Sequence, residues 1–180
     1  MPLAEEFNKL HDLINNTYLI KDPGIIRLLA AAVVSHRLPS DPVWICIVAG
    51  SSGGKTELIN GLSKITSIFA LDSLTTQTFL SGQKRGAVET SLLFRIGSGI
   101  ITMKDFTTIL SMQRDARGEI MGQLRKIYDG EFSKSFGTGD DQVWRGKISL
   151  IAGATTTIYT VGREYAAMGE RMLLYKFIQP

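Results

Sequence analysis

Short apolar runs separated by polar and turn residues recur along the chain from residue 43 onward. The first run, Val43–Val48, is continuous and uncharged, as expected for a strand that is buried on both faces of a sheet. We interpret it as a central parallel strand. Four similar runs follow at Thr66–Leu71, Ile100–Met103, Ile148–Ala152 and Leu173–Ile178. Because helical segments lie between most of these runs, the pattern predicts an α/β fold, a three-layer sandwich with a mostly parallel five-stranded sheet.

Two helices are expected before the first strand. Apolar residues at helical spacing predict the first of them. These residues are Phe7, Leu10 and Ile14. Asp22 followed by Pro23 is an N-cap with proline at the first helical position, and it predicts a second helix that ends at about Leu38. We therefore expect residues 1–40 to form a helical segment packed on a core of residues 41–180, in one domain overall.

A later segment combines a helix with an inserted β-hairpin. The helix is expected over Arg114–Tyr128, where one face is apolar. The apolar face consists of Ile120, Leu124 and Ile127. After it, Phe132–Phe136 and Val143–Lys147 flank the turn-rich Gly137–Asp141, which indicates a hairpin inserted into the α/β pattern.

The composition excludes several classes of protein. With 44% hydrophobic and 21% charged residues, the chain can bury a core and is not collagen-like, coiled-coil or disordered. The longest uncharged stretches, Pro42–Gly54 and Ile148–Gly162, are shorter than the roughly 20 apolar residues of a membrane span. The N-terminus lacks the basic region and apolar run of a secretory signal. We expect no membrane association.

Cysteine usage and charge add two expectations. Cys46 is the single cysteine, which excludes an internal disulfide and a cysteine metal cluster and points to a reducing, cytoplasmic compartment. The net charge is +3, and the surplus of basic residues lies in the second half of the chain. This permits a polyanionic partner but is far weaker than the dense basic patch typical of nucleic-acid binders.

A glycine-rich loop follows the first predicted strand and precedes a helix that opens with Glu57–Leu62. The loop consists of Ala49, Gly50, Ser51, Ser52, Gly53, Gly54, Lys55 and Thr56. This is the phosphate-binding loop pattern, with alanine in place of the usual first glycine. Small residues let successive backbone N–H groups point at phosphate oxygens, and the helix N-terminus adds its positive dipole end. The pattern predicts a nucleotide site in which Lys55 contacts the β- and γ-phosphates and the Thr56 hydroxyl binds Mg²⁺.

The third predicted strand is closed by an acidic residue, Asp105. In such folds an aspartate at the carboxyl end of a neighbouring strand completes the magnesium site, so we assign this role to Asp105. Hydrolysis also needs a group that orients or deprotonates the attacking water. Many such ATPases carry a glutamate directly after the strand-end aspartate, but Phe106 stands there. Glu57, Glu89 and Asp72 are the alternatives, and the sequence does not choose among them.

Two further segments complete the candidate catalytic set. The fourth predicted strand ends at Gly153–Thr156, which presents hydroxyl groups beside the expected γ-phosphate position. A helical segment and Gly169–Arg171 follow, directly before the fifth strand. An arginine at this junction can stabilise charge on a transferring phosphate, usually that of a neighbouring subunit, and otherwise is an ordinary surface cation.

This succession of phosphate loop, strand ending in Asp, hairpin, strand ending in Thr and arginine before a last strand resembles the AAA+ ATPase core. The inserted hairpin is similar to that of the superfamily 3 and related helicase branches. Over about residues 40–178 the chain more closely resembles ATPase domains of phage and mobile-element replication proteins, often described as helicases or primase-helicases. The segments that carry this resemblance are Asp41–Trp44, Lys104–Leu110, Tyr128–Gly130, Trp144–Lys147 and Gly169–Arg171.

The resemblance implies a role for each candidate residue. By it, Lys55, Thr56 and Asp105 hold Mg-ATP, Thr155 acts as the first sensor and Arg171 as an arginine finger or sensor. It also implies a homo-oligomeric ring, such as a hexamer, that acts on single-stranded or duplex DNA in the cytoplasm of a bacterium or a phage-infected host.

Three features depart from the family pattern. No acid follows Asp105, and the hairpin tip carries Asp140 and Asp141 where a DNA-tracking loop is expected to be basic. The sequence given also stops after its fifth strand, without the helical lid that often follows in AAA+ proteins, and two interpretations stay open: a fragment of a longer protein or a minimal form.

Three classes of function fit these observations. The first is a ring-forming, helicase-type ATPase that uses ATP and Mg²⁺, and it is the one we favour. The second is a P-loop small-molecule kinase, which commonly needs an arginine-rich lid, whereas the most basic segment, Arg114–Lys126, is typical of an amphipathic helix. The third is a nucleotide-dependent binding module with little turnover, for which the missing glutamate is the main argument.

Overall fold

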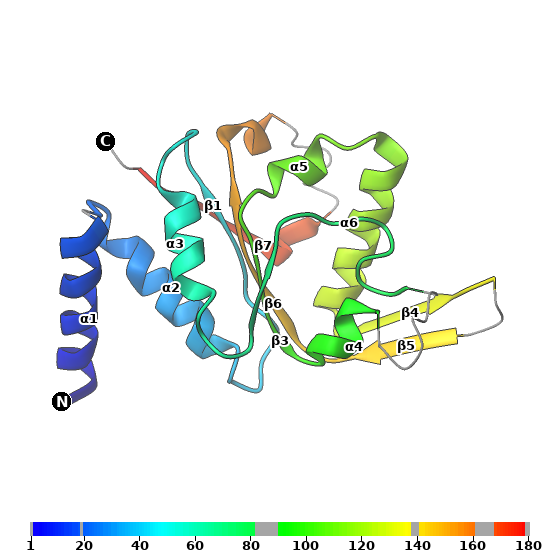
Figure 1. Cartoon of the computed structure of the whole chain (residues 1–180), viewed down its shortest axis with the longest axis horizontal. Coiled ribbons are helices and arrows are strands. Elements are labelled where there is room, and N and C mark those ends of the chain that lie inside the picture. Colours follow the sequence, from blue (N-terminus) through cyan, green and yellow to red (C-terminus); the bar gives the residue numbers. More distant parts are fainter. Residues whose placement is uncertain (1, 19, 82–89, 138–140, 161–167, 179–180) are drawn as a thin grey trace.

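A five-stranded, all-parallel sheet forms the centre of the molecule, with strand order β2-β3-β6-β1-β7. Its strands are β1 (Trp44–Val48), β2 (Ile68–Leu71), β3 (Gly99–Met103), β6 (Ile148–Ala154) and β7 (Met172–Lys176). The computed structural model describes residues 2–18, 20–81, 90–137, 141–160 and 168–178 (Figure 1). Every residue of β1, β3 and β6 is buried, because these strands lie inside the sheet and helices cover both faces. The predicted α/β class and five-stranded parallel sheet are confirmed.

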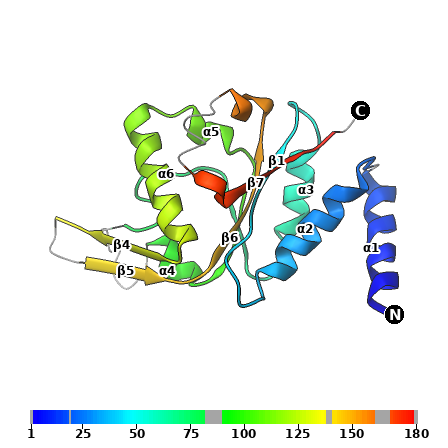
Figure 2. The same ribbon diagram turned by 180° about the vertical axis from the view of Figure 1, so that it is seen from behind.

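Alternation along the strands divides the core into two layers. Trp44, Cys46 and Val48 of β1 point to one face, and Ile45 and Ile47 point to the other, as the two-residue period of a strand requires. Figures 1 and 2 show α1, α2 and α3 on one side of the sheet and α4 and α6 on the other. The molecule is therefore a helix–sheet–helix sandwich.

The first two helices are present as the sequence predicted. They are α1 (Pro2–Tyr18) and α2 (Pro23–Ser35). Asp22 caps α2, because its carboxylate accepts a 2.9 Å hydrogen bond from the N–H of Gly24. The helix ends at Ser35, three residues before the predicted Leu38, where the chain turns toward β1.

The remaining helices connect the strands. They are α3 (Lys55–Leu62), α4 (Leu92–Ile96), α5 (Thr107–Leu110) and α6 (Arg114–Tyr128), with short 3₁₀ turns η1 (Thr156–Tyr159) and η2 (Gly169–Arg171). The bounds of α6 are those predicted, and its buried face includes Ile120, Leu124 and Ile127. The helical segment expected between the fourth strand and Gly169 lies largely outside the described residues.

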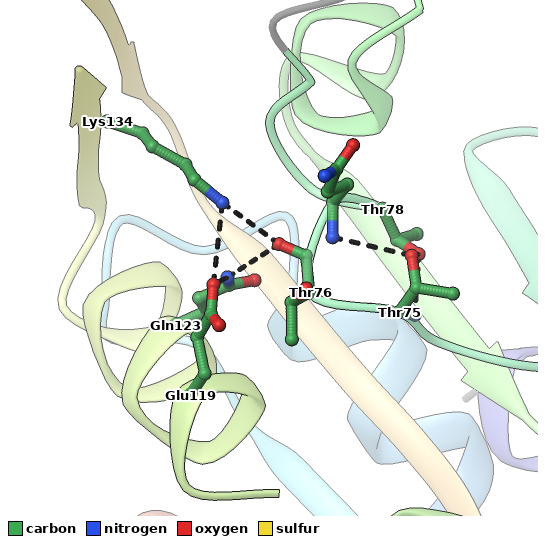
Figure 3. A network of polar contacts seen from close by, with 7 residues as sticks. Thr75, Thr76, Thr78, Glu119, Gln123 and Lys134 are labelled. Carbon is green, nitrogen blue, oxygen red and sulfur yellow. Dashed lines mark hydrogen bonds and ion pairs between the residues drawn. The ribbon is translucent and has the colours of Figure 1, made fainter. Parts of the chain in front are cut away.

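The predicted hairpin is present as a separate two-stranded antiparallel sheet. Its strands are β4 (Glu131–Ser135) and β5 (Asp141–Arg145), and residues 138–140 of the tip, Asp140 among them, lie outside the described part of the chain. Figure 3 shows how the hairpin is fastened to the body. The Thr76 carbonyl accepts hydrogen bonds from Lys134 Nζ at 3.1 Å and from Gln123 Nε2 at 2.8 Å, and Glu119 accepts from the same two side chains.

Several predicted strand boundaries are wrong by one or two residues. The second strand begins at Ile68 rather than at Thr66, because Ser67 has a positive φ of 74° that no extended strand can include. The fourth strand continues to Ala154 rather than ending at Ala152, and the fifth covers Met172–Lys176 rather than Leu173–Ile178.

The connections of the sheet create a topological switch point. The chain leaves β1 toward β2 at one edge of the sheet, whereas it leaves the adjacent β6 toward β7 at the other edge. In open α/β sheets, ligands bind in the crevice outside the carboxyl ends of two such strands. The strand order also corrects one detail, because β3, which precedes Asp105, is separated from β1 by β6.

Candidate functional site

The glycine-rich loop lies at the carboxyl end of β1, at the switch point with β6. The N–H of Ala49 donates to the Ala154 carbonyl at 3.2 Å, which joins the start of the loop to the end of β6. Gly54 has a φ of 78°, a left-handed conformation that favours glycine, and it stands at the N-cap of α3 with no side chain capping the helix. The first N–H groups of α3 lack intrahelical acceptors, so the loop presents free donors and the positive end of a helix dipole.

Lys55 is buried beneath this loop. Its side chain is 8% exposed, and its ammonium donates to the carbonyls of Ala49 at 3.0 Å and Gly50 at 2.6 Å. Burial lowers the pKa of Lys55, and the nearby Asp105 carboxylate opposes this shift. Among the described residues Lys55 is the one buried charged side chain, and none of its described partners is a carboxylate at ion-pair distance. A buried cation that only carbonyls satisfy favours an anion at this place.

Asp105 follows β3, at the same carboxyl ends of the strands as the glycine-rich loop. It is exposed, and its Oδ1 accepts a 2.9 Å hydrogen bond from the N–H of Thr107. Burial raises the pKa of the Cys46 thiol in β1 to about 12, and both Asp105 and Lys55 act electrostatically on that thiol. The Asp105 carboxylate and the Lys55 ammonium therefore lie close enough to act electrostatically on the same side chain of β1 and on each other.

Thr155 follows β6 and is joined to the segment after β3. Its N–H donates to Thr107 Oγ1 at 3.0 Å, and the two hydroxyl oxygens are 3.3 Å apart. The N–H of Phe106 donates to the Gly153 carbonyl at 2.7 Å, and a Cβ at Gly153 would lie 2.5 Å from the Lys104 carbonyl oxygen. This close crossing needs glycine, and it brings the hydroxyl of Thr155 beside the carboxylate-bearing turn.

Thr56 is the second residue of α3 and is exposed. Its hydroxyl and the Oδ2 of Asp105 have no hydrogen-bond partner within the described part of the chain. Hydroxyl and carboxylate oxygens are ligands that Mg²⁺ accepts, together with phosphate oxygens and water. These two residues therefore fit part of a magnesium shell, whereas no cluster of three or more His, Cys, Asp or Glu side chains that could hold a metal occurs among the described residues.

The structure narrows the candidates for a water-activating residue. Phe106, which replaces the expected acid, is fully buried and has no polar side chain. Asp72 is bound to Lys104 by a 3.1 Å ion pair at the ends of β2 and β3. Glu57 is exposed on the first turn of α3, and Glu89 lies outside the described residues.

Arg171 lies at the amino ends of the strands, whereas the glycine-rich loop lies at their carboxyl ends. It directly precedes β7, whose first residue, Met172, pairs with Trp44 at the start of β1, so about 16 Å of strand separates it from the glycine-rich loop. Its guanidinium binds Asp129, with Nε and Nη2 donating to Oδ1 at 3.2 and 3.1 Å, and it lies 5.6 Å from the centre of the Tyr128 ring. Arg171 therefore cannot reach the loop of its own chain.

A groove beside the loop was not predicted from the sequence. It has a volume of about 120 Å³ and is lined by Tyr18, Ile20, Gly54, Glu57, Leu58 and Phe177. The lining comes from the end of α1 and the connection that follows it, from the start of α3 and from the residue after β7, which only the fold brings together. Thr107 was also missed as a site residue, although its place two positions after Asp105 is typical of an aspartate-capped turn.

Two comparisons of the sequence with known proteins find no match. No protein-family model matches the sequence, and no curated protein matches it significantly. In the described part of the chain, no helix has the length and apolar character needed to cross a membrane.

Proposed function

We propose that this protein binds Mg-ATP at the glycine-rich loop and hydrolyses it, as a P-loop ATPase of the AAA+-like type. The observation that carries the proposal is the buried Lys55 ammonium, held by two carbonyls at the switch point and lacking an anionic partner among the described residues. A triphosphate is an anion of the right kind, because the free N–H groups at the start of α3 also point to this place.

The remaining residues fit a division of roles around a bound triphosphate. Lys55 would neutralise the phosphates, while Thr56 and Asp105 would hold Mg²⁺, which supplies charge neutralisation when bound. Thr155 would donate its hydroxyl to the terminal phosphate, in the position that the family resemblance gives to a sensor. The groove beside Gly54 would take the nucleobase, because most of the side chains that line it are apolar or aromatic.

One experiment separates the three functional classes. Mg-ATP binding is measured by calorimetry, and phosphate release is measured with and without single-stranded DNA. A helicase-type ATPase hydrolyses ATP faster when DNA is added, and a ring-forming homo-oligomer assembles with the nucleotide. A small-molecule kinase turns over little without an acceptor, and DNA does not change its rate. Failure to bind Mg-ATP at micromolar to millimolar concentration contradicts the proposal.

A nucleotide-dependent binding module is the second candidate. Two observations favour it: the buried phenylalanine at position 106 and the ion pair that already occupies Asp72. Phe106 has no group that could act on a water molecule, and the carboxylate of Asp72 is paired with an ammonium. Tight Mg-ATP binding with no measurable phosphate release, with or without DNA, would select this function over the ATPase.

Replacement of Asp105 by asparagine is expected to reduce magnesium-dependent turnover at least about tenfold while the protein stays folded. The shape of the side chain is retained, and its Oδ1 can still accept from Thr107, but a metal-facing negative charge is lost. Phosphate release measured against Mg²⁺ concentration checks this. Asp12→Asn on the surface of α1 is the matched control and should leave turnover unchanged. Equal magnesium dependence in Asp105→Asn and the wild type would remove Asp105 from the site.

Truncation of Tyr18 tests the groove. Tyr18 is 48% exposed at the end of α1, so its loss should not disturb the core. If a base stacks there, Tyr18→Ala should weaken ATP binding by about five- to tenfold and leave inorganic tripolyphosphate binding unchanged. Calorimetry with both ligands measures the difference, and Leu13→Ala, on the exposed surface of the same helix, is the control. Equal weakening for ATP and tripolyphosphate would show that the groove takes no base.

A further inference from the structure

Thr107 contacts both halves of the site after β3 and β6. Its N–H donates to Asp105 Oδ1 at 2.9 Å, and its Oγ1 accepts from the N–H of Thr155 at 3.0 Å. Its Oγ1 also lies 3.3 Å from Thr155 Oγ1. One residue thus fixes the orientation of the Asp105 carboxylate and the backbone position of Thr155.

The hydroxyl groups of Thr107 and Thr155 together offer two hydrogen-bond donors. Each hydroxyl has one proton to donate, and the 3.3 Å contact between the two oxygens uses one of the two protons. The Thr155 N–H already occupies one lone pair of Thr107 Oγ1. Whichever hydroxyl donates within the pair, one O–H remains to donate to a group outside it.

This arrangement matters because the usual acid is absent. Phe106 is fully buried, and its N–H is used to join the two strand ends through Gly153. A threonine hydroxyl does not become a strong base at neutral pH, so it can orient a phosphate or a water but not deprotonate it. A preorganised donor of this kind acts on the rate when it binds charge that develops during the reaction.

We propose that Thr107 is a positioning residue of the phosphate site: paired with Thr155, it directs the remaining hydroxyl proton of the pair to the terminal phosphate of the bound nucleotide. The inference rests on the proposed ATPase function and adds a residue to it. A Thr107 that only stabilises the turn after β3 would affect stability and nucleotide affinity, but it would not act selectively on the rate constant.

The test uses three variants of the full chain. Thr107→Val removes the hydroxyl and keeps the N–H that binds Asp105, Thr107→Ser keeps both, and Thr108→Val is the matched control. Thr108 is the exposed neighbour in α5, and in the described part of the chain its hydroxyl bonds only to the backbone carbonyl of Asp105, not to the carboxylate. For each protein we measure kcat and KM for Mg-ATP, the Kd of Mg-ATP by calorimetry, and thermal stability.

We expect Thr107→Val to lower kcat by about 10- to 100-fold, with KM and Kd within about threefold of the wild type. Thr107→Ser should restore kcat to within about threefold of the wild type, and Thr108→Val should leave it unchanged. The double variant Thr107→Val/Thr155→Val should be no slower than the slower single variant, because the two hydroxyls act as one unit. If Thr107→Val does not fold, Thr107→Ala replaces it in the same comparison.

The possible outcomes separate the inference from the function on which it rests. A wild-type protein that hydrolyses ATP, together with an unchanged kcat in Thr107→Val, overturns the inference and leaves the ATPase function intact. A loss confined to KM or Kd, or no rescue by serine, also overturns it. A wild-type protein that neither binds nor hydrolyses Mg-ATP overturns both.

Discussion

Replacement of Lys55 by alanine is expected to weaken Mg-ATP binding at least tenfold. The Lys55 ammonium is the buried cation beneath the glycine-rich loop, and the side chain has no described carboxylate partner that could compensate for its charge. Its loss removes the main side-chain contact with the β- and γ-phosphates, which the backbone donors of the loop and Mg²⁺ would then have to hold without it. Calorimetric titration of Mg-ATP into the folded variant measures the change.

The control must separate loss of the phosphate contact from damage to the loop. Lys64→Ala removes an exposed lysine just after α3 and should leave Mg-ATP affinity unchanged. Because the alanine variant also leaves the carbonyls of Ala49 and Gly50 without their donor, circular dichroism and thermal melting must show that it is folded. Wild-type affinity in a folded Lys55→Ala protein would rule out the loop as the phosphate site.

Replacement of Arg171 by alanine is expected to leave ATP binding nearly normal and to slow hydrolysis by about 10³- to 10⁵-fold, if Arg171 acts on the nucleotide of a neighbouring subunit. Its position supports action in trans, because the length of the sheet separates it from the loop of its own chain. Its side chain is also 32% exposed, so a partner could reach it. Single-turnover and steady-state phosphate release measure the loss.

Because Arg171 is paired with Asp129, a second variant is needed to separate an effect on catalysis from the loss of this ion pair. Arg171→Ala removes both the arginine and its ion pair, whereas Asp129→Asn weakens the pair and keeps the arginine. If Arg171 acts on phosphate, only the first variant should lose turnover. If the pair merely holds β7 against the end of α6, both variants should lose stability and activity together.

A mixing experiment tests whether Arg171 acts in trans, on the nucleotide of a neighbouring subunit. The Lys55→Ala protein keeps Arg171, and the Arg171→Ala protein keeps an intact phosphate site, so a mixed ring should regain activity that neither variant has alone. If mixed oligomers form and activity does not return, the trans role is wrong.

The sequence predicted the elements that depend on local pattern. The continuous apolar run of β1 and the helical periodicity of α6 each specify one element, and both are where the pattern put them. The start of β2 was wrong because a single residue, Ser67, has a left-handed backbone that its identity does not reveal. Strand boundaries depend on such local deviations, which apolar runs do not encode.

The sequence could indicate only those parts of the candidate site whose residues are neighbours in the chain. Lys55, Thr56 and Gly54 belong to one contiguous motif, so their proximity follows from the chain itself. Thr107 could not be recognised as a site residue from the sequence, because it contacts Thr155, 48 residues away, only when β3 and β6 pair. The groove could not be predicted from local sequence at all, because two of its lining residues, Ile20 and Phe177, come from opposite ends of the chain.

The strand order also determines when the sheet can form during synthesis. Among the described strands, β1 is hydrogen-bonded to β6 and β7 alone, so about 100 residues must follow Val48 before its first partner emerges from the ribosome. At 5–20 residues per second, that strand waits roughly 5–20 s without a neighbour. Such distant pairings make folding slow and leave an apolar segment exposed in the nascent chain. Trp44–Val48 is therefore an apolar segment that remains without its strand partners until more than half of the chain has been made.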